Sequence, residues 1–183
     1  MENTLAVLAL GSNIGDYTTN IQKAIREIAQ ECGRVRKVSS LYTTKPLPTE
    51  GNSGDDYRNL VILIETPLTP KALIGKTLEI ERRLGRIREE NIKWEPRTID
   101  IDIITYGAEI IREEDLTIPH PRYHERDFVL LPLQEVAPDF RDPISNSSIQ
   151  ELINALPDDS RTIHSKASIE VPALRESYSK NVA

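Results

Sequence analysis

Apolar and polar residues follow two different periods along the first 106 residues. Continuous apolar runs at 5–10 and 60–64 are typical of strands buried on both faces, and the second run extends to a predicted strand over 57–65. Residues 35–42 mix β-branched and small side chains, and residues 98–106 alternate polar and apolar side chains strictly. The pattern therefore predicts four strands.

Apolar residues at helical spacing predict a helix after the first strand and another after the third. Asn13 or Asp16 can cap the first helix, after a turn that begins at Gly11. Thr69 at the cap and a proline at the next position open the second helix, and Gly85 closes it. The first helix places its apolar face at Ile21, Ala24, Ile25, Ile28 and Ala29.

The resulting order, β-α-β-β-α-β, predicts the ferredoxin-like α+β fold, with an antiparallel sheet and both helices on one face. The other face needs separate cover or becomes the working surface, and short elements over 116–138 could border it. Ser148 and Glu151 form a capping box that predicts a further helix over 148–156. We expect one domain over 1–156 with short C-terminal additions. The tail 157–183 has fewer apolar residues, and it either packs on the sheet or hangs free.

Composition limits the classes of ligand that the protein is expected to bind and indicates its cellular compartment. The net charge of −6 gives no overall attraction to nucleic acid or to an anionic membrane, so a polyanionic ligand requires a local basic patch. The single cysteine, Cys32, excludes an intrachain disulfide and fits a reducing cytosol. The N-terminal apolar run is too short for a signal peptide or a membrane span. A cytoplasmic protein that binds neither nucleic acid nor membrane is therefore expected.

Asp100 and Asp102 are the residues most suggestive of chemistry. They are two apart on a predicted strand, so they share a face while Ile99, Ile101 and Ile103 enter the core. Two adjacent carboxylates repel each other, and Mg²⁺ between them would relieve that repulsion. Alone, the pair could equally be a solvent-facing strand. Basic residues crowd the preceding stretch and favour a phosphoryl-transfer site: Arg82, Arg83, Arg86, Arg88, Lys93 and Arg97.

Other motifs of catalysis do not occur in the sequence. There is no P-loop signature, no Cys/His cluster with zinc-ligand spacing, and no serine in a nucleophile-elbow context. His120 lies between two prolines that restrict the backbone. It could point at a phosphate, or it could be an ordinary loop histidine.

Taken together, the spaced motifs resemble the 6-hydroxymethyl-7,8-dihydropterin pyrophosphokinase family of folate biosynthesis. The resemblance runs from about residue 5 to residue 138, in the same order throughout, and the family has the ferredoxin-like fold. The matching pieces are Gly11-Ser12-Asn13, Ser39-Ser40-Leu41-Tyr42, Thr44-x-Pro46, Tyr57-x-Asn59, Ile80-Glu81, Gly85-Arg86-x-Arg88, Trp94-x-Pro96-Arg97-x-x-Asp100-x-Asp102, Pro119-His120 and Arg126-x-Phe128.

The resemblance implies transfer of the terminal pyrophosphoryl unit of ATP to the hydroxymethyl oxygen of the pterin, with release of AMP. It implies two Mg²⁺ ions at Asp100 and Asp102, with Arg86 and Arg97 also catalytic. The implied ATP contacts are Glu81, Arg86, Arg88, Trp94, Arg97, Ile103, Thr117, His120 and Arg126. The implied pterin contacts are Thr44, Leu47, Tyr57, Asn59, Trp94, Asp100 and Phe128.

The chemistry of the implied pterin residues fits a flat heterocycle. Tyr57 and Phe128 would sandwich the ring, and stacking contributes roughly 1–3 kcal/mol per face by analogy with nucleic-acid bases. Asn59 offers both a donor and an acceptor to the amide edge. Two departures from the family pattern, Pro48 and Glu95, could change the pterin loop and the charge near the phosphates.

Three alternatives stay open at this point. A non-catalytic pterin or purine binder on the same scaffold would not need the two aspartates. Another Mg²⁺-dependent nucleotidyltransferase would split ATP at the α-phosphorus and release pyrophosphate. A ferredoxin-like RNA-binding module is disfavoured by the apolar strand 60–64 and by the net charge.

Overall fold

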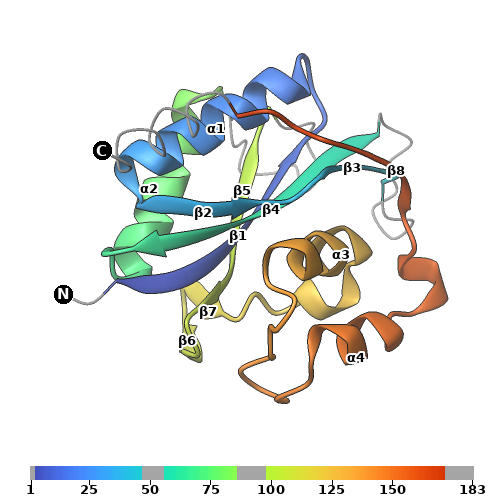
Figure 1. The fold of residues 1–183 in the computed structure, drawn as a ribbon. Helices are drawn as coiled ribbons and strands as arrows, with labels where there is room; N and C mark the ends of the chain where they lie inside the picture. The colour runs from blue at the N-terminus through green and yellow to red at the C-terminus, as the bar shows by residue number, and fades with distance from the viewer. Residues whose placement is uncertain (1–2, 47–55, 86–97, 172–183) are drawn as a thin grey trace, which may run out of the picture.

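The structure is a computed structural model that describes residues 3–46, 56–85 and 98–171. An antiparallel sheet of six strands forms its centre, in the order β5-β1-β4-β3-β8, with β2 also paired to β4 (Figure 1). This arrangement confirms the predicted α+β, ferredoxin-like sheet. The strands are β1 (Thr4–Ser12), β2 (Arg34–Val38), β3 (Leu41–Thr44), β4 (Tyr57–Thr66), β5 (Asp100–Tyr106) and β8 (Ile163–Ala167), and a separate hairpin joins β6 (Ile111–Glu113) to β7 (Leu116–Ile118).

Helices α1 (Tyr17–Glu31) and α2 (Pro70–Arg83) cover one face of the sheet (Figure 1). The Asp16 carboxylate caps α1 by accepting the Thr19 N–H at 3.0 Å, and Thr69 caps α2 in the same way. Both helices contribute apolar side chains to a core that includes Ala6, Leu8 and Leu10 of β1. The helical spacing in the sequence therefore identified the inward-facing positions.

The opposite face is covered in part by α3 (Asp127–Val136) and α4 (Ile149–Asn154) (Figure 1). Residues of α3 form a second core with Val7 of β1, Val61 of β4 and Ile104 of β5. Short elements were predicted for this segment, whereas α3 is a helix of ten residues that contains Pro132. The predicted capping box is present at the start of α4, at Ser148 and Glu151.

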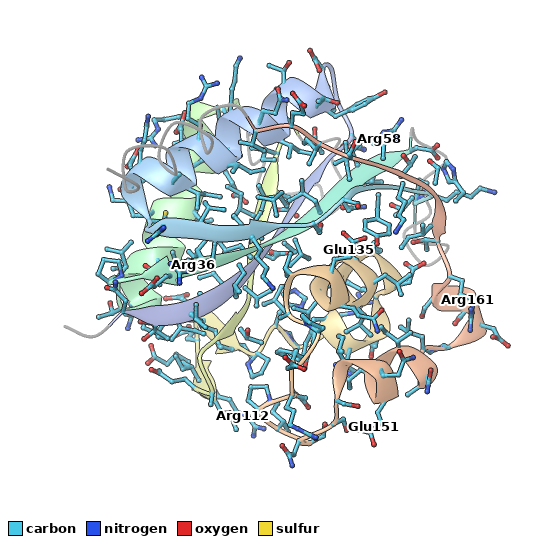
Figure 2. The ribbon with its side chains drawn as sticks, in the orientation of Figure 1. Arg36, Arg58, Arg112, Glu135, Glu151 and Arg161 are labelled. Carbon is cyan, nitrogen blue, oxygen red and sulfur yellow. The ribbon has the colours of Figure 1, made fainter. Side chains whose placement is uncertain are left out.

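The prediction of a single strand over 35–42 is wrong, because Ser39 and Ser40 separate strand β2 from strand β3. Ser39 stays attached to β4: its Oγ accepts the Val61 N–H at 3.0 Å, and its N–H donates to the Val61 carbonyl at 3.0 Å. The Glu135 carboxylate of α3, labelled in Figure 2, accepts the Ser40 N–H and the Tyr42 hydroxyl, both at 2.6 Å. Hydrogen bonds to β4 and to α3 therefore satisfy the backbone N–H groups of the two residues between β2 and β3.

Part of the C-terminal tail packs on the sheet. Strand β8 pairs antiparallel with β3, with Ile163 opposite Thr44 and Ala167 opposite Leu41. The sequence left open whether the tail packs on the sheet or hangs free, and residues 163–167 pack on the sheet.

Candidate active site

The antiparallel register brings the predicted metal and pterin residues onto one face of the sheet. Gly11 of β1 lies between Asn59 of β4 and Asp100 of β5, and Ala9 lies between Val61 and Asp102. Directly paired residues of an antiparallel sheet point to the same side, here the side that α3 partly covers. Two strand spacings separate the Cα atoms of Asn59 and Asp100, about 10 Å in all.

Gly11 is a site feature whose role the sequence did not reveal. The predicted turn at this position is wrong, because β1 continues through Gly11 to Ser12. A Cβ atom on Gly11 would lie 2.8 Å from Oδ1 of Asn59, closer than such atoms pack. The Asn59 amide is itself fixed, since its Nδ2 donates to Thr44 Oγ1 at 2.8 Å. A glycine inside a strand pattern is the signal of such a close approach.

The strand that carries the two aspartates is held at its free edge by Glu81. The Glu81 side chain is 2% exposed, and its Oε1 accepts the Ile101 N–H at 2.7 Å, between the two aspartates in sequence. Ile101 and Ile103 are buried, while Asp100 and Asp102 are only half-buried, as the strict alternation predicted. Glu81 therefore positions β5, and its predicted contact with ATP stays a prediction.

The side chains of Arg126 and His120 lie near Asp102 but beyond hydrogen-bond distance. Nε2 of His120 lies 4.0 Å and NH1 of Arg126 lies 3.9 Å from Asp102 Oδ2. Both separations exceed hydrogen-bond length. All three side chains thus approach one small region from β5, the loop after β7, and the start of α3. Such a convergence of donors and a carboxylate suits a polyphosphate with a cation.

The position of His120 depends on an irregularity in β5. The pairing of β1 with β5 shifts between Val7 and Leu8, which makes Ile104 an extra residue on β5. The Ile104 carbonyl accepts the His120 N–H at 2.9 Å. The sequence could not show this contact, because it requires both the shift and the path of the loop after β7.

The environment of His120 keeps the imidazole neutral. Burial, and then the charge of Arg126, lower its pKa from 6.5 to about 4, against a smaller opposing effect of Asp100. Nδ1 accepts the Arg122 N–H at 3.2 Å, so in the neutral ring the proton resides on Nε2. His120 therefore presents a neutral N–H donor on the Asp102 side.

The aspartate pair fits Mg²⁺ by its donor set. Within the three described stretches, no group of three or more His, Cys, Asp or Glu side chains could hold a metal by itself. Mg²⁺ differs from zinc in this respect, because it commonly takes one or two carboxylates and completes its shell with waters and substrate phosphates. Asp100 and Asp102, half-buried and on one face, supply that kind of incomplete shell.

Phe128 follows Arg126 by two residues and lies in the first turn of α3. It packs partly buried against the second core, and the Arg126 guanidinium lies 5.6 Å from the centre of its ring. On β4, Tyr57 pairs with Thr44 of β3. Tyr57 lies two residues before Asn59, so both side chains are on the same face of the sheet. Thr44, Tyr57, Asn59 and Asp100 thus share the α3 side of the sheet, on adjacent rows.

The remaining predicted residues have different placements. The Ile103 side chain is 4% exposed and lies in the core under α1 and α2, which leaves only its backbone for a nucleotide. Thr117 is exposed on β7. The residues predicted at Leu47, Arg86, Arg88, Trp94 and Arg97, and the two departures at Pro48 and Glu95, lie outside the described residues.

Comparison with known proteins adds sequence evidence. The family model described as 7,8-dihydro-6-hydroxymethylpterin-pyrophosphokinase (HPPK) matches residues 7–138. A 2-amino-4-hydroxy-6-hydroxymethyldihydropteridine pyrophosphokinase of Synechocystis is 44% identical over 149 residues, which cover 81% of this chain and 74% of that protein. The protein of the same name from Bacillus subtilis is 44% identical over 135 residues, or 73% of this chain and 78% of its own.

A solved structure supports the fold independently. The crystal structure of Plasmodium falciparum HPPK-DHPS superposes with a TM-score of 0.68 at 17% identity, over 84% of this chain. This chain spans 44% of that longer one, so the likeness concerns only part of it. Within the described residues, no helix is both long and apolar enough to cross a membrane.

Proposed function

Because the chain belongs to the 7,8-dihydro-6-hydroxymethylpterin-pyrophosphokinase family, we propose that it transfers pyrophosphate from ATP to 6-hydroxymethyl-7,8-dihydropterin. The observation that carries the proposal is the sheet register, which aligns Asn59, Gly11 and Asp100 in one row. A pterin-binding amide and a metal-binding carboxylate then lie about 10 Å apart, two strand spacings. That separation suits a pterin whose hydroxymethyl group must reach a bound polyphosphate.

The pterin would lie over the row of Asn59 and Gly11. Gly11 has no side chain, so the Asn59 amide oxygen packs directly over its backbone, and the amide nitrogen is held by Thr44. Phe128 approaches from α3 and Tyr57 from the next row of β4. A flat ring between two aromatic faces and beside an amide is the arrangement that such residues favour.

The polyphosphate would lie over Asp102, His120 and Arg126. We infer that two Mg²⁺ ions bind at Asp100 and Asp102, where they would neutralise the charge that shifts during transfer. The neutral His120 donates through Nε2 to a phosphate oxygen, and Arg126 contributes a fixed positive charge. Contacts from Arg86, Arg88, Trp94 and Arg97 are part of the proposal through the family resemblance.

In the reaction, the hydroxymethyl oxygen attacks the β-phosphorus of ATP. The bond between that phosphorus and the oxygen leading to the α-phosphate breaks, so AMP leaves with the bridging oxygen and the hydroxyl proton is released. Because the transition state is loose, the residues act mainly by alignment and by stabilising charge. A cytoplasmic location, which the composition favours, stays a prediction.

Product analysis tests this proposal directly. Incubation with ATP, Mg²⁺ and 6-hydroxymethyl-7,8-dihydropterin should yield AMP and the pterin pyrophosphate in equal amounts. ADP would indicate transfer of a single phosphoryl group, and free pyrophosphate would indicate a nucleotidyltransferase. Pterin binding without nucleotide turnover would leave the non-catalytic binder as the better assignment.

A further inference from the structure

Residues 160–171 form a C-terminal strap that runs from the start of α3, along β3, to α1 (Figure 1). The strap lies beyond residue 138, where the family match ends. It is attached at both ends: the Thr162 N–H donates to the Asp127 carboxylate at the start of α3, and the Glu170 carbonyl accepts a hydrogen bond from Nε2 of Gln22 on α1 at 2.7 Å. Ile169 and Val171 pack against the core under α1 and α2.

The strongest contact of the strap is with Asp127, which lies between Arg126 and Phe128. The Asp127 side chain is 4% exposed, and all three hydrogen bonds that it receives from the strap come from two adjacent residues. Its carboxylate accepts the Thr162 N–H at 2.7 Å, the Thr162 hydroxyl at 2.7 Å and the Ile163 N–H at 3.0 Å. A buried carboxylate with three short donors is held firmly, because losing any one leaves charge poorly compensated.

Thr162 and Ile163 also contact the end of β3, which carries another residue of the proposed pterin site. The Thr162 carbonyl accepts the Lys45 N–H at 3.1 Å, and Ile163 is paired with Thr44, the residue that fixes the Asn59 amide. One residue further, His164 lies 2.8 Å from the Asp56 carboxylate, next to Tyr57. Thr162 and Ile163 therefore connect the end of β3 with the start of α3.

We propose that Thr162 is a positioning residue for pterin binding, through its hydrogen bonds to Asp127. It acts on Phe128 through Asp127 and on Asn59 through Lys45 and Thr44, without touching the pterin. The inference rests on the proposed function, since it assigns the pterin to these residues. It predicts that weakening this contact raises the KM for the pterin more than the KM for ATP, because two elements of the pterin site depend on it.

The test uses the full-length chain and three variants. Thr162→Val removes the hydroxyl and keeps the side-chain shape, and Thr162→Ser restores the hydroxyl. Thr66→Val is the matched control, because the buried Thr66 hydroxyl donates to the Cys32 carbonyl at 2.5 Å at the far end of β4. Thr66 is seven positions from Asn59 along β4, which corresponds to about 23 Å.

Initial rates with varied pterin and varied ATP are measured well below the unfolding temperature, beside calorimetric pterin binding with an ATP analogue whose α–β bridging oxygen is a methylene. We expect Thr162→Val to raise the pterin KM and dissociation constant about tenfold, or about 1.4 kcal/mol, and the ATP KM by much less. Thr162→Ser should restore most of the pterin affinity. Thr66→Val should lower the urea midpoint and leave both KM values unchanged.

An unchanged pterin KM in Thr162→Val, or equal rises in the two KM values, overturns the positioning role. So does a pterin defect of equal size in Thr66→Val, because the effect would then follow stability alone. If Thr162→Val does not fold, Asp127→Asn tests the same contact from the other side, because it replaces one acceptor oxygen with an amide donor, and the same pterin-selective rise is required. Wild-type turnover is measured first, so that failure of the proposed function is distinguished from failure of this inference.

Discussion

The neutral state of His120 should be visible in the pH dependence of stability. Its folded pKa of about 4 lies below the ordinary value of 6.5, because burial and the charge of Arg126 disfavour the imidazolium. In the unfolded chain the ring protonates near pH 6.5. The unfolded state therefore binds more protons between these values, so the contribution of His120 is fully present above pH 6.5 and is lost as the pH falls towards 4.

The structure sets the size of this effect. A difference of about 2.5 pH units corresponds to at most about 3 kcal/mol at 1.36 kcal/mol per unit. The His120 side chain is 20% exposed, so solvent screening reduces the effect only modestly. The charge of Asp100 opposes the shift, and Arg122 acts in the same direction as Arg126.

Urea denaturation from pH 4 to pH 7.5 measures the effect, with His120→Asn as the comparison. The amide of the substituted side chain would keep an acceptor close to the position of Nδ1, so the Arg122 N–H can still be satisfied. The wild-type protein should lose up to about 3 kcal/mol more than the variant on acidification, with a slope of at most 1.36 kcal/mol per unit for one proton. Titration of the His120 ring by NMR gives the folded pKa directly.

Two results would refute the reasoning. One is a wild-type pH profile parallel to that of His120→Asn, and the other is an NMR pKa near 6.5. A further expectation follows for the bound state. Addition of a non-hydrolysable ATP analogue with Mg²⁺ should change the pKa of His120 only if the phosphates reach Nε2, so an unchanged titration would argue against the proposed contact.

Three further substitutions test separate parts of the site. Asp102→Asn should abolish turnover at saturating Mg²⁺ with an unchanged circular dichroism spectrum, and retention of most of the rate would exclude Asp102 as a metal ligand. Phe128→Ala should weaken pterin binding by roughly 1–3 kcal/mol, measured by calorimetry; an unchanged dissociation constant would count against stacking. Gly11→Ala places a Cβ 2.8 Å from Asn59 Oδ1, so it should weaken pterin binding and destabilise the fold by about 1–3 kcal/mol. A Gly11→Ala protein with normal pterin affinity would show that the Asn59 amide moves freely.

Local patterns were sufficient to predict most elements of the sheet and its first helices. Caps such as Asp16 and Thr69 act within one turn, and the spacing of Asp100 and Asp102 fixes their common face without knowledge of the rest of the chain. Features that depend on distant contacts were missed. The Ser40 N–H, in the interruption after β2, donates to Glu135, which is 95 residues away in sequence. Residues 163–167 form strand β8 because they pair with β3.

Helix α3 illustrates a different limit. A proline in the interior, Pro132, lowers helix propensity and removes a backbone donor, so the sequence favours shorter elements there. The buried residues of α3 outweigh that cost by packing on Val61 and Ile104. Similarly, the arrival of His120 beside Asp102 requires the shifted register at Ile104, which no local pattern encodes.

The odd-numbered positions of β1 explain how one face of the sheet serves both as core and as site. Val7 is buried under α3, Ala9 is half-buried beside Asp102, and Gly11 separates Asn59 from Asp100. Side-chain volume thus falls stepwise along the strand, while Ala6, Leu8 and Leu10 on the other face keep the core under α1 and α2 filled. Because β1 stays paired with both β4 and β5 at Ala9 and Gly11, the Asn59 amide oxygen packs over Gly11 without loss of strand pairing there. A paired strand that lacks side-chain bulk at one end therefore lets the Asn59 amide lie against its backbone, and the proposed pterin position depends on that amide.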